Sequence, residues 1–434
     1  MLAALGLEDL ADLFEPVPER FRLTRDLDLP PALSEVELMG HMRAFARRAR
    51  GAEEITCFAG GGAYDHFVPA AVKALASRAE FATSYTPYQP ELSQGVLQAL
   101  FEFQTAVCEI FALEVANASL YDGANALVEG VNLAVRQTKR HKVVVSSAVH
   151  PHYRDVLKTY TSGLGLDIEL APLGEDGATD WDAVGLAESA AAVVSYPSFL
   201  GGLDPVGVVA DAAHDAGALC IAVTDPTAMG VLRAPGEAGA DIAVGEGQAL
   251  GNALSYGGPY VGLLATKLSL IRQVPGRIAG ETVDADGRRA YVLTLQAREQ
   301  HIRRARATSN VCTNQTLMAI AAAIHLCWLG PEGLRRLGEL CIDRTARTAE
   351  RLGDIAGCSV RFEGPYFKEF VLQTPVPGER LLQGLARRGV LAGPALGRWW
   401  PEMDNCVLVA ATERRTDEDI TMLAEAVEKE LAER

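Results

Sequence analysis

Two short segments carry groups that could bind a charged ligand. Asp122 and Gly123 precede apolar residues at helical spacing, so a tight turn there would open a helix whose first backbone N–H groups attract anions. Asp225 directly follows an apolar run, 219–224, with the composition of a buried strand. A carboxylate in that place can hold a protonated nitrogen of a ligand, or it can cap the turn before Pro226. Both interpretations of Asp225 stay open.

A strand that ends in aspartate resembles the arrangement in fold-type-I pyridoxal-phosphate enzymes, where the carboxylate faces the pyridinium nitrogen. That fold places a lysine roughly two dozen positions later, because only a primary amine can bond covalently to the cofactor's aldehyde. The corresponding window, 242–251, contains no lysine and has Gln248 there. Among the chain's seven lysines Lys267 lies closest, but it follows a run, 263–266, that has the pattern of a further strand.

Buried strands and helices must position these residues. Apolar runs and helical patterns alternate along the chain, at 142–146, 191–195, 219–224 and 241–244 for the runs and at 96–113, 123–135 and 208–216 for the helices. Near-continuous apolar strands separated by helices indicate a parallel sheet covered on both faces. We therefore predict an α/β fold of the fold-type-I pyridoxal-phosphate-dependent transferase type, with a large parallel or mixed-sheet domain.

The C-terminal part has a different pattern. A long Ala-rich helix is predicted over 313–328, with Gly330 and Pro331 as stop and restart signals before a second helix. Strands at 360–362, 367–373 and 407–410, a helix near 380–388 and a closing helix from Thr416 indicate a smaller α+β domain. The predicted divisions are an N-terminal arm (1–60), a large domain (61–310) and a small C-terminal domain (311–434).

Composition excludes several function classes. The net charge of −16, without a long basic block, argues against nucleic acid as a partner. The N-terminus resembles an acidic amphipathic helix and not an export signal, and the apolar stretch 317–329 is too short for a membrane span. The eight cysteines form no Cys-x-x-Cys pair, which argues against a zinc site or a disulfide framework and fits a reducing cytoplasm.

Nine segments resemble, in order and along nearly the whole chain, the alpha subunit (subunit 1) of the two-subunit glycine decarboxylase, the P-protein of the glycine cleavage system. They are 58–69 (FAGGGAYDHFVP), 85–95 (YTPYQPELSQG), 121–124 (YDGA), 150–154 (HPHYR), 245–248 (GEGQ), 256–259 (YGGP), 275–278 (PGRI), 294–300 (TLQAREQ) and 308–314 (TSNVCTN). One such match is weak evidence, but nine in family order are hard to obtain by chance.

The resemblance implies an oxidoreductase of glycine catabolism that acts on the CH–NH2 group with a disulfide acceptor, and that is active only with a partner. The partner would be a homologous beta subunit, in an α2β2 heterotetramer, that carries the lysine and binds most of the pyridoxal phosphate. The complex would release carbon dioxide from glycine and pass the aminomethyl group to the lipoyl arm of the H-protein. On this basis Gly123 and Asp225 are vestiges of a cofactor site, and Asp122 would repel a phosphate.

The resemblance also implies residues that line the shared active site. Tyr85, Tyr88 and Gln89 belong to a proline-stiffened loop, 84–89, that would reach into the beta subunit's site, where tyrosine hydroxyls could donate to the cofactor phosphate or the glycine carboxylate. The alternative is that these tyrosines only pack at the subunit interface, where tyrosine is common.

A second group of polar residues, Ser309, Asn310, Thr313 and Asn314, is assigned with His66 to the same cleft. We favour the interpretation that Thr313 or Asn314 caps the following helix, which leaves Asn310 as the better functional candidate. His66 is about as consistent with a structural histidine as with a substrate contact.

Two other functions stay open. The chain could be a self-sufficient pyridoxal-phosphate decarboxylase or aminotransferase that uses Lys267, or a non-catalytic scaffold that stabilises the beta subunit.

Overall fold

The computed structural model describes residues 1–51, 54–83 and 85–433, and it divides into two compact units, Met1–Gly51 and Ala52–Arg434. The first unit contains α1 (Leu2–Leu5), η1 (Leu10–Phe14), η2 (Glu19–Phe21) and α2 (Glu35–Ala46). A capping box between Ser34 and Glu37 begins α2. None of the 51 residues of this unit is buried. The boundaries expected at residues 60 and 310 stay predictions.

A seven-stranded sheet forms the centre of the second unit, in the order β2-β8-β7-β6-β5-β3-β4. Its strands are β2 (Val115–Ala116), β3 (Lys142–Ser146), β4 (Asp167–Ala171), β5 (Ser189–Tyr196), β6 (Leu219–Thr224), β7 (Ile242–Glu246) and β8 (Gly262–Thr266). The five strands from β7 to β4 are parallel, and β8 pairs antiparallel with β7 and β2. The predicted apolar runs are therefore strands of a mixed, mostly parallel sheet.

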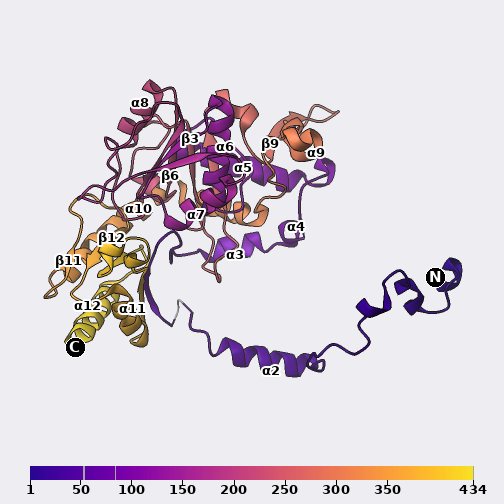
Figure 1. Ribbon diagram of the computed structural model, residues 1–434, viewed down its shortest axis with the longest axis horizontal. Coiled ribbons are helices and arrows are strands. Elements are labelled where there is room, and N and C mark those ends of the chain that lie inside the picture. Colours follow the sequence, from indigo (N-terminus) through magenta and orange to yellow (C-terminus); the bar gives the residue numbers. More distant parts are fainter. Residues whose placement is uncertain (52–53, 84, 434) are drawn as a thin grey trace. The chain divides into compact units, whose positions relative to one another are not determined.

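Helices cover both faces of this sheet (Figure 1). They are α5 (Gln94–Phe111), α6 (Gly123–Thr138), α7 (Pro151–Thr161), α8 (Val206–Asp215) and α10 (Thr316–Gly353). Alternate strand residues point to opposite faces, so Val145 and Val244 pack with α6 and α7, whereas Ala222 packs with α8 and Ala243 with α5 and α10. This burial on both faces explains why the strands have no polar alternation.

The helix α10 breaks at Gly330, which has a φ of 60° and a ψ of −178°, and continues from Pro331. The predicted stop and restart is thus confirmed, but the helix begins at Thr316 and not at 313. Of the described helices α10 alone is long and apolar enough to span a membrane, and 44% of its most apolar window is buried in the protein. Ala319 and Ile320 lie in the core against α5, as expected for the core helix of a globular domain.

The C-terminal part has a core of its own around an antiparallel sheet of order β11-β12-β14. Its elements are β11 (Ser359–Val360), β12 (Glu369–Gln373), α11 (Gly378–Arg387), β13 (Val390–Gly393), η8 (Leu396–Arg398), η9 (Pro401–Met403), β14 (Cys406–Ala410) and α12 (Asp417–Ala432). A capping box between Thr416 and Asp419 begins α12, as the sequence predicts. The early strand β1 (Thr56–Ala59) pairs in parallel with β13, so the segment after β1 starts next to β12.

The remaining elements lie between β1 and α10 along the chain. They are α3 (Ala70–Ala76), α4 (Ala79–Ala82), η3 (Pro90–Leu92), η4 (Ala228–Gly230), η5 (Leu268–Gln273), β9 (Ile278–Val283), β10 (Arg289–Thr294), η6 (Gln296–Arg298), α9 (Gln300–Arg303) and η7 (Arg304–Arg306). The hairpin β9–β10 packs on α5, where the Gln104 side chain donates to the Ala279 carbonyl at 3.0 Å and accepts from its N–H at 2.8 Å.

Candidate functional site

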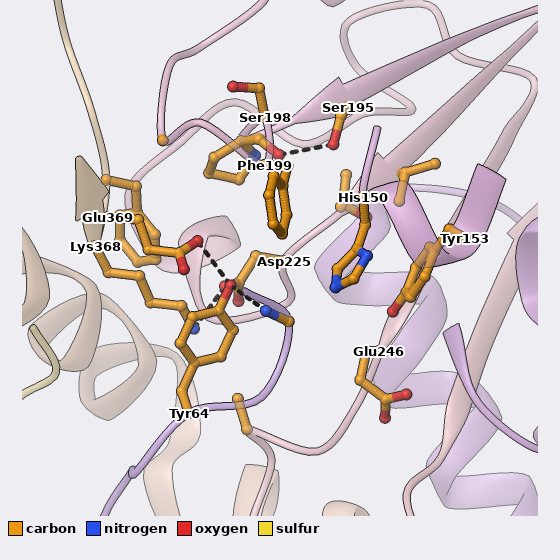
Figure 2. A pocket seen from close by; sticks show the side chains of 17 residues that line it. Tyr64, His150, Tyr153, Ser195, Ser198, Phe199, Asp225, Glu246, Lys368 and Glu369 are labelled. Carbon is orange, nitrogen blue, oxygen red and sulfur yellow. Dashed lines mark hydrogen bonds and ion pairs between the residues drawn. The ribbon is translucent and has the colours of Figure 1, made fainter. Parts of the chain in front are cut away.

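A cleft lies at the carboxyl ends of β5, β6 and β7, and Ser195, Asp225 and Glu246 line it from these strands. Open α/β sheets bind their ligands at this edge. Lys368 and Glu369, at the start of β12, close the opposite wall (Figure 2). The inner cavity measures about 70 Å³, and His150, Tyr153 and Glu246 also line an adjoining pocket of about 370 Å³ that reaches the start of α6. Pockets that bury small ligands usually measure roughly 300–1,000 Å³, so only the inner part of the cleft, beside Asp225 and Lys368, is too small for such a ligand.

Asp225 is paired inside the cleft with a buried lysine. Its Oδ2 lies 2.6 Å from Nζ of Lys368, whose side chain is 2% exposed. Its Oδ1 accepts from the N–H of Thr227 at 2.9 Å and from its hydroxyl at 2.6 Å. Burial by itself raises the pKa of Asp225. The charge of Lys368 and these hydrogen bonds outweigh this effect and hold the pKa below its ordinary value. Asp225 therefore caps the turn, and its other oxygen is bound to a cation from this chain.

The Lys368 ammonium also lies 3.5 Å from the ring centroid of Tyr64. Beyond it, the Tyr64 hydroxyl donates to Oε2 of Glu369 at 2.8 Å, and the Gly61 N–H donates to Oε1 at 2.6 Å. Burial raises the pKa of Glu369 to about 7. No local pattern in the sequence pointed to Lys368, because the contact joins two segments that are distant along the chain.

The N-terminus of α6 is bound by carboxylates of the same chain. The Gly123 N–H donates to Oε2 of Glu246 at 2.9 Å, and the Asn125 N–H donates to Oδ1 of Asp122 at 2.8 Å. Burial raises the pKa of Glu246 to about 8, despite further hydrogen bonds from the backbone N–H groups of Val261 and Gln248. The predicted turn is present, and its Gly123 and Asn125 N–H groups already have carboxyl partners from this chain.

Gln248 has a structural role in this wall. Its side chain accepts from the Tyr64 N–H at 2.8 Å and donates to the carbonyls of Tyr64 at 3.1 Å and Asn252 at 2.7 Å. These contacts hold the Tyr64 segment against the end of β7.

Lys267 lies at the opposite end of the strands, beside the amino end of β7. It follows β8, which is antiparallel to β7, so its Nζ meets Oδ1 of Asp241, just before β7 begins, at 2.6 Å. A strand of five residues separates it from the cleft, about 16 Å at roughly 3.3 Å per residue. The alternative in which Lys267 holds the cofactor is therefore wrong.

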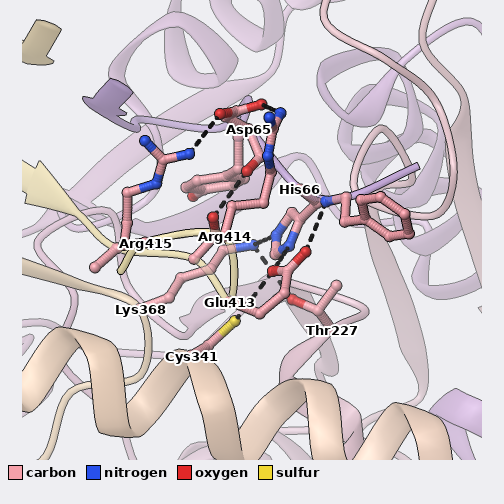
Figure 3. Close-up of polar contacts among 12 residues, drawn as sticks. Asp65, His66, Thr227, Cys341, Lys368, Glu413, Arg414 and Arg415 are labelled. Atoms are coloured by element: carbon pink, nitrogen blue, oxygen red, sulfur yellow. Dashed lines mark hydrogen bonds and ion pairs between the residues drawn. The ribbon is translucent and has the colours of Figure 1, made fainter. Parts of the chain in front are cut away.

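His66 lies in a buried polar cluster beside the cleft (Figure 3). Its Nδ1 is 2.6 Å from Oε2 of Glu413, and its Nε2 is 3.0 Å from Nζ of Lys368. Burial alone would raise the pKa of Glu413, but the hydrogen bond and charge of His66 lower it to about 2. Both ring nitrogens of His66 have partners, which fits a structural histidine, and its contact with substrate stays a prediction.

Cys341 belongs to the same cluster. Its sulfur, Oε2 of Glu413 and a ring nitrogen of His66 lie within 4.8 Å of one another, a set that could ligate a metal ion. Burial raises the pKa of the Cys341 thiol. Metal ligation requires the thiolate, and the close His66–Glu413 contact leaves little room between these two ligands. The cluster is thus explained as a hydrogen-bonded network.

The loop predicted to reach a partner lies outside the cleft. Tyr85 is 75% exposed and Tyr88 is 62% exposed, and Gln89 directly precedes η3. Ser84, which belongs to the predicted loop 84–89, lies outside the described residues. The exposure of both tyrosines leaves them available to a partner, but their role at an active site stays a prediction.

Asn314 and Tyr88 both contact Arg277. The Arg277 guanidinium donates to Oδ1 of Asn314 at 3.3 Å and lies 5.1 Å from the Tyr88 ring centroid. The Asn314 side chain donates in turn to the Ala118 carbonyl at 2.7 Å. Arg277 was not among the predicted site residues, although it stands in one of the family segments.

The capping interpretation for Thr313 and Asn314 is wrong. The N-cap of α10 is Gln315, and no side-chain hydrogen bond caps the helix. Ser309 is buried and accepts from the Val311 N–H at 3.0 Å, whereas Asn310 is exposed. The segment leading into α10 is instead tied to the Ala118 region through Asn314.

Residues 1–427 match the family described as "Glycine cleavage system P-protein". The chain belongs to this family. Two curated relatives from this P-protein family are named "Probable glycine dehydrogenase (decarboxylating) subunit 1". The Desulforamulus reducens protein is 47% identical over 98% of this chain and 96% of its own length. The Moorella thermoacetica protein is 47% identical over 100% of this chain and 97% of its own length. The resemblance inferred from sequence is thus confirmed.

Solved structures agree with the predicted fold class. An inhibitor-bound crystal structure of glycine decarboxylase (P-protein) of the glycine cleavage system matches with a TM-score of 0.93 and 46% identity, covering 99% of this chain and 97% of that one. A sphingosine-1-phosphate lyase from Burkholderia pseudomallei, 14% identical, matches in fold with a TM-score of 0.69, covering 96% of this chain and 95% of that one. The fold-type-I pyridoxal-phosphate-dependent transferase fold is confirmed.

This fold implies pyridoxal phosphate, but the cleft of this chain does not fit it. A carboxylate that should face the ring nitrogen is bound to Lys368, and the helix N-terminus that should hold the phosphate is bound to Glu246. An alanine Cβ at Gly123 would lie 2.3 Å from the Tyr153 hydroxyl, so the turn is packed closely as well. Gln248 offers no amine. In this chain, side chains of the chain itself therefore fill the inner part of the P-protein cleft and bind the groups that a cofactor would need.

Proposed function

We propose that this chain is the alpha subunit of a glycine decarboxylase and works with a homologous beta subunit in an α2β2 assembly. The beta subunit holds the pyridoxal phosphate and the lysine that bonds to it. The complex releases carbon dioxide from glycine and passes the aminomethyl group to the lipoyl arm of the H-protein. The name "subunit 1" of the relatives supports a partner subunit. We place the complex in the cytoplasm, in keeping with eight free cysteines.

The observation that carries this proposal is the filled inner cleft, in which groups of this chain pair with one another. The Asp225–Lys368 pair and the Glu246 contact with α6 satisfy, within one chain, the groups that a cofactor would need. Separating the Asp225–Lys368 pair would leave a buried charge without a partner, and displacing Glu246 would leave a buried N–H group without one, and both are costly. A chain of this fold that cannot accept the cofactor can take part in the reaction only by completing a site held by another chain.

The exposed loop with Tyr85 and Tyr88 is the element we assign to that purpose. Phenol hydroxyls donate hydrogen bonds without carrying a charge, so they can hold a phosphate or a carboxylate without drawing off a proton. Gln89, Asn310, Thr313 and Asn314 remain candidates for the same face.

The test compares the purified chain alone with the chain mixed with its beta subunit. The isolated chain should show no absorbance of bound pyridoxal phosphate and no exchange of the glycine carboxylate with bicarbonate, and the mixture should show both. Borohydride reduction of the mixture followed by mass analysis should place the pyridoxyl adduct on the beta subunit. An adduct on this chain, or exchange by this chain alone, would overturn the proposal.

A scaffold that only stabilises the beta subunit is the second candidate, and the filled cleft favours it to the same extent. Alanine substitutions of Tyr85, Tyr88 and Asn310 distinguish the two. An intact complex with wild-type exchange would identify a scaffold, whereas a stable complex with reduced exchange would identify a contributor to the active site.

A further inference from the structure

Arg277 is a buried cation without an anionic partner. Only 5% of the residue is exposed. Its guanidinium donates to the Cys312 carbonyl at 2.8 Å and to Oδ1 of Asn314 at 3.3 Å, and both acceptors are neutral. Within the described ranges, no carboxylate forms an ion pair with it. Buried charges in proteins are usually paired, so an uncompensated guanidinium next to the surface indicates that an anion joins it from outside.

A neighbouring arginine shows what a purely structural guanidinium does in this part of the chain. Arg298 is also buried, and its three nitrogens donate to the backbone carbonyls of Val274, Gly276 and Leu295. It therefore fastens the turn before β9. Arg277 donates one hydrogen bond to a backbone carbonyl and one to a side-chain amide, of the five that a guanidinium can donate, and the others are left for a further acceptor.

The surroundings of Arg277 orient it towards the surface that carries the predicted partner loop. Asn314 is fixed by the Ala118 carbonyl at 2.7 Å and the Ser119 hydroxyl at 3.0 Å, so its Oδ1 is held towards the guanidinium. The exposed Tyr88 ring stacks over the same guanidinium. A planar fork with fixed neighbours suits a planar carboxylate or a phosphate.

We propose that Arg277, positioned by Asn314 and covered by Tyr88, is an anion-binding site that completes the active site of the beta subunit. This inference rests on the proposed function and deepens it. The bound group is an oxyanion, either the carboxylate of glycine or the phosphate of the cofactor held by the partner.

The experiment uses the assembled complex with R277Q, with R277K and with R298Q as the matched control. The R277Q side chain can still reach a neutral acceptor but has no charge, and the R277K side chain keeps the charge without the fork. Two constants are measured: the dissociation constant for pyridoxal phosphate, by absorbance titration, and the KM for glycine in bicarbonate exchange. R277Q should raise one of them about 10- to 100-fold, since a charge-assisted hydrogen bond gives about 1.5–3 kcal/mol. R298Q removes the hydrogen bonds to Val274 and Gly276 and so measures the effect of loosening the turn that carries Arg277; R277Q should raise its constant several-fold more than R298Q does.

The outcomes separate the two sources of the oxyanion. A weaker affinity for pyridoxal phosphate with an unchanged KM for glycine assigns the site to the phosphate. A raised KM for glycine with an unchanged affinity for pyridoxal phosphate assigns it to the glycine carboxylate. If R277Q does not assemble, R277K should still assemble and show the same constant raised, by a smaller factor. Wild-type values for both constants in an assembled R277Q or R277K complex would overturn the inference. Failure of the wild-type complex to exchange bicarbonate would instead refute the proposed function.

Discussion

Replacing Lys368 with methionine removes the buried cation that pairs with Asp225 at 2.6 Å and lies 3.0 Å from Nε2 of His66. Methionine preserves most of the side-chain volume, so the loss is mainly electrostatic. Removing one partner of a buried ion pair costs about 3–5 kcal/mol, because the remaining charge has no compensation. We expect K368M to unfold at a markedly lower urea concentration than the wild-type chain at pH 8.

The pH dependence gives the sharper test. In the wild type the pKa of Asp225 is below its ordinary value, so the carboxylate contributes stability above the unfolded-state pKa, and this is lost as the pH falls through the folded-state pKa. In K368M burial is no longer offset by Lys368, and the pKa of Asp225 should rise above the unfolded value. The cost of burying the unpaired Asp225 carboxylate then applies above that raised pKa and becomes smaller as the pH falls. The deficit of K368M should therefore be larger at pH 8 than at pH 5.

Urea unfolding followed by tryptophan fluorescence measures both effects. K267M is the control, because the partner of Lys267, Asp241, keeps His214 at 2.8 Å and Lys267 is partly exposed. The double variant D225N/K368M should recover much of the lost stability, since it removes both charges of the Asp225–Lys368 pair. Equal midpoints for K368M and the wild type at pH 8, or a double variant no more stable than K368M, would refute the reasoning.

Three further predictions follow from single contacts. Tyr88→Phe should lower kcat/KM for glycine in the assembled complex about tenfold, as expected when a hydrogen bond to a charged group is lost; unchanged turnover and glycine affinity would remove the active-site role of this hydroxyl. Gly123→Ala should lower the melting temperature, because its Cβ would lie 2.3 Å from the Tyr153 hydroxyl, and overpacking costs about 1–3 kcal/mol; Gly95→Ala, with nothing within 4 Å, is the control and should not lower it. K368M should remain free of pyridoxal phosphate when titrated with it, because Gln248 still stands after β7 where the fold places a lysine. An absorbance band of bound cofactor would contradict the statement that the missing amine prevents binding.

Local patterns sufficed for the architecture. Runs such as 219–224 are continuously apolar because both faces of their sheet are covered, and this burial is visible in residue types alone. Gly330 and Pro331 break a helix, and Thr416 begins one, through backbone geometry and capping that depend on near neighbours. The absence of a lysine from 242–251 is likewise a property of the sequence, and the family segments made the relationship recognisable.

Tertiary structure decided how the functional groups are paired. Asp225 forms an ion pair with Lys368, and the Gly123 N–H donates to the Glu246 carboxyl group. The Asn314 side chain accepts from Arg277 and does not cap the helix that follows it. None of these partners is near in sequence, and each was selected by the packing of strand ends and loops. Helix and strand periodicity predicts which residues are buried, but it does not predict which polar groups form hydrogen bonds or ion pairs with one another. For that physical reason the sequence indicated where a cofactor site should be, and only the fold revealed that Lys368 and Glu246 of the same chain bind its key groups.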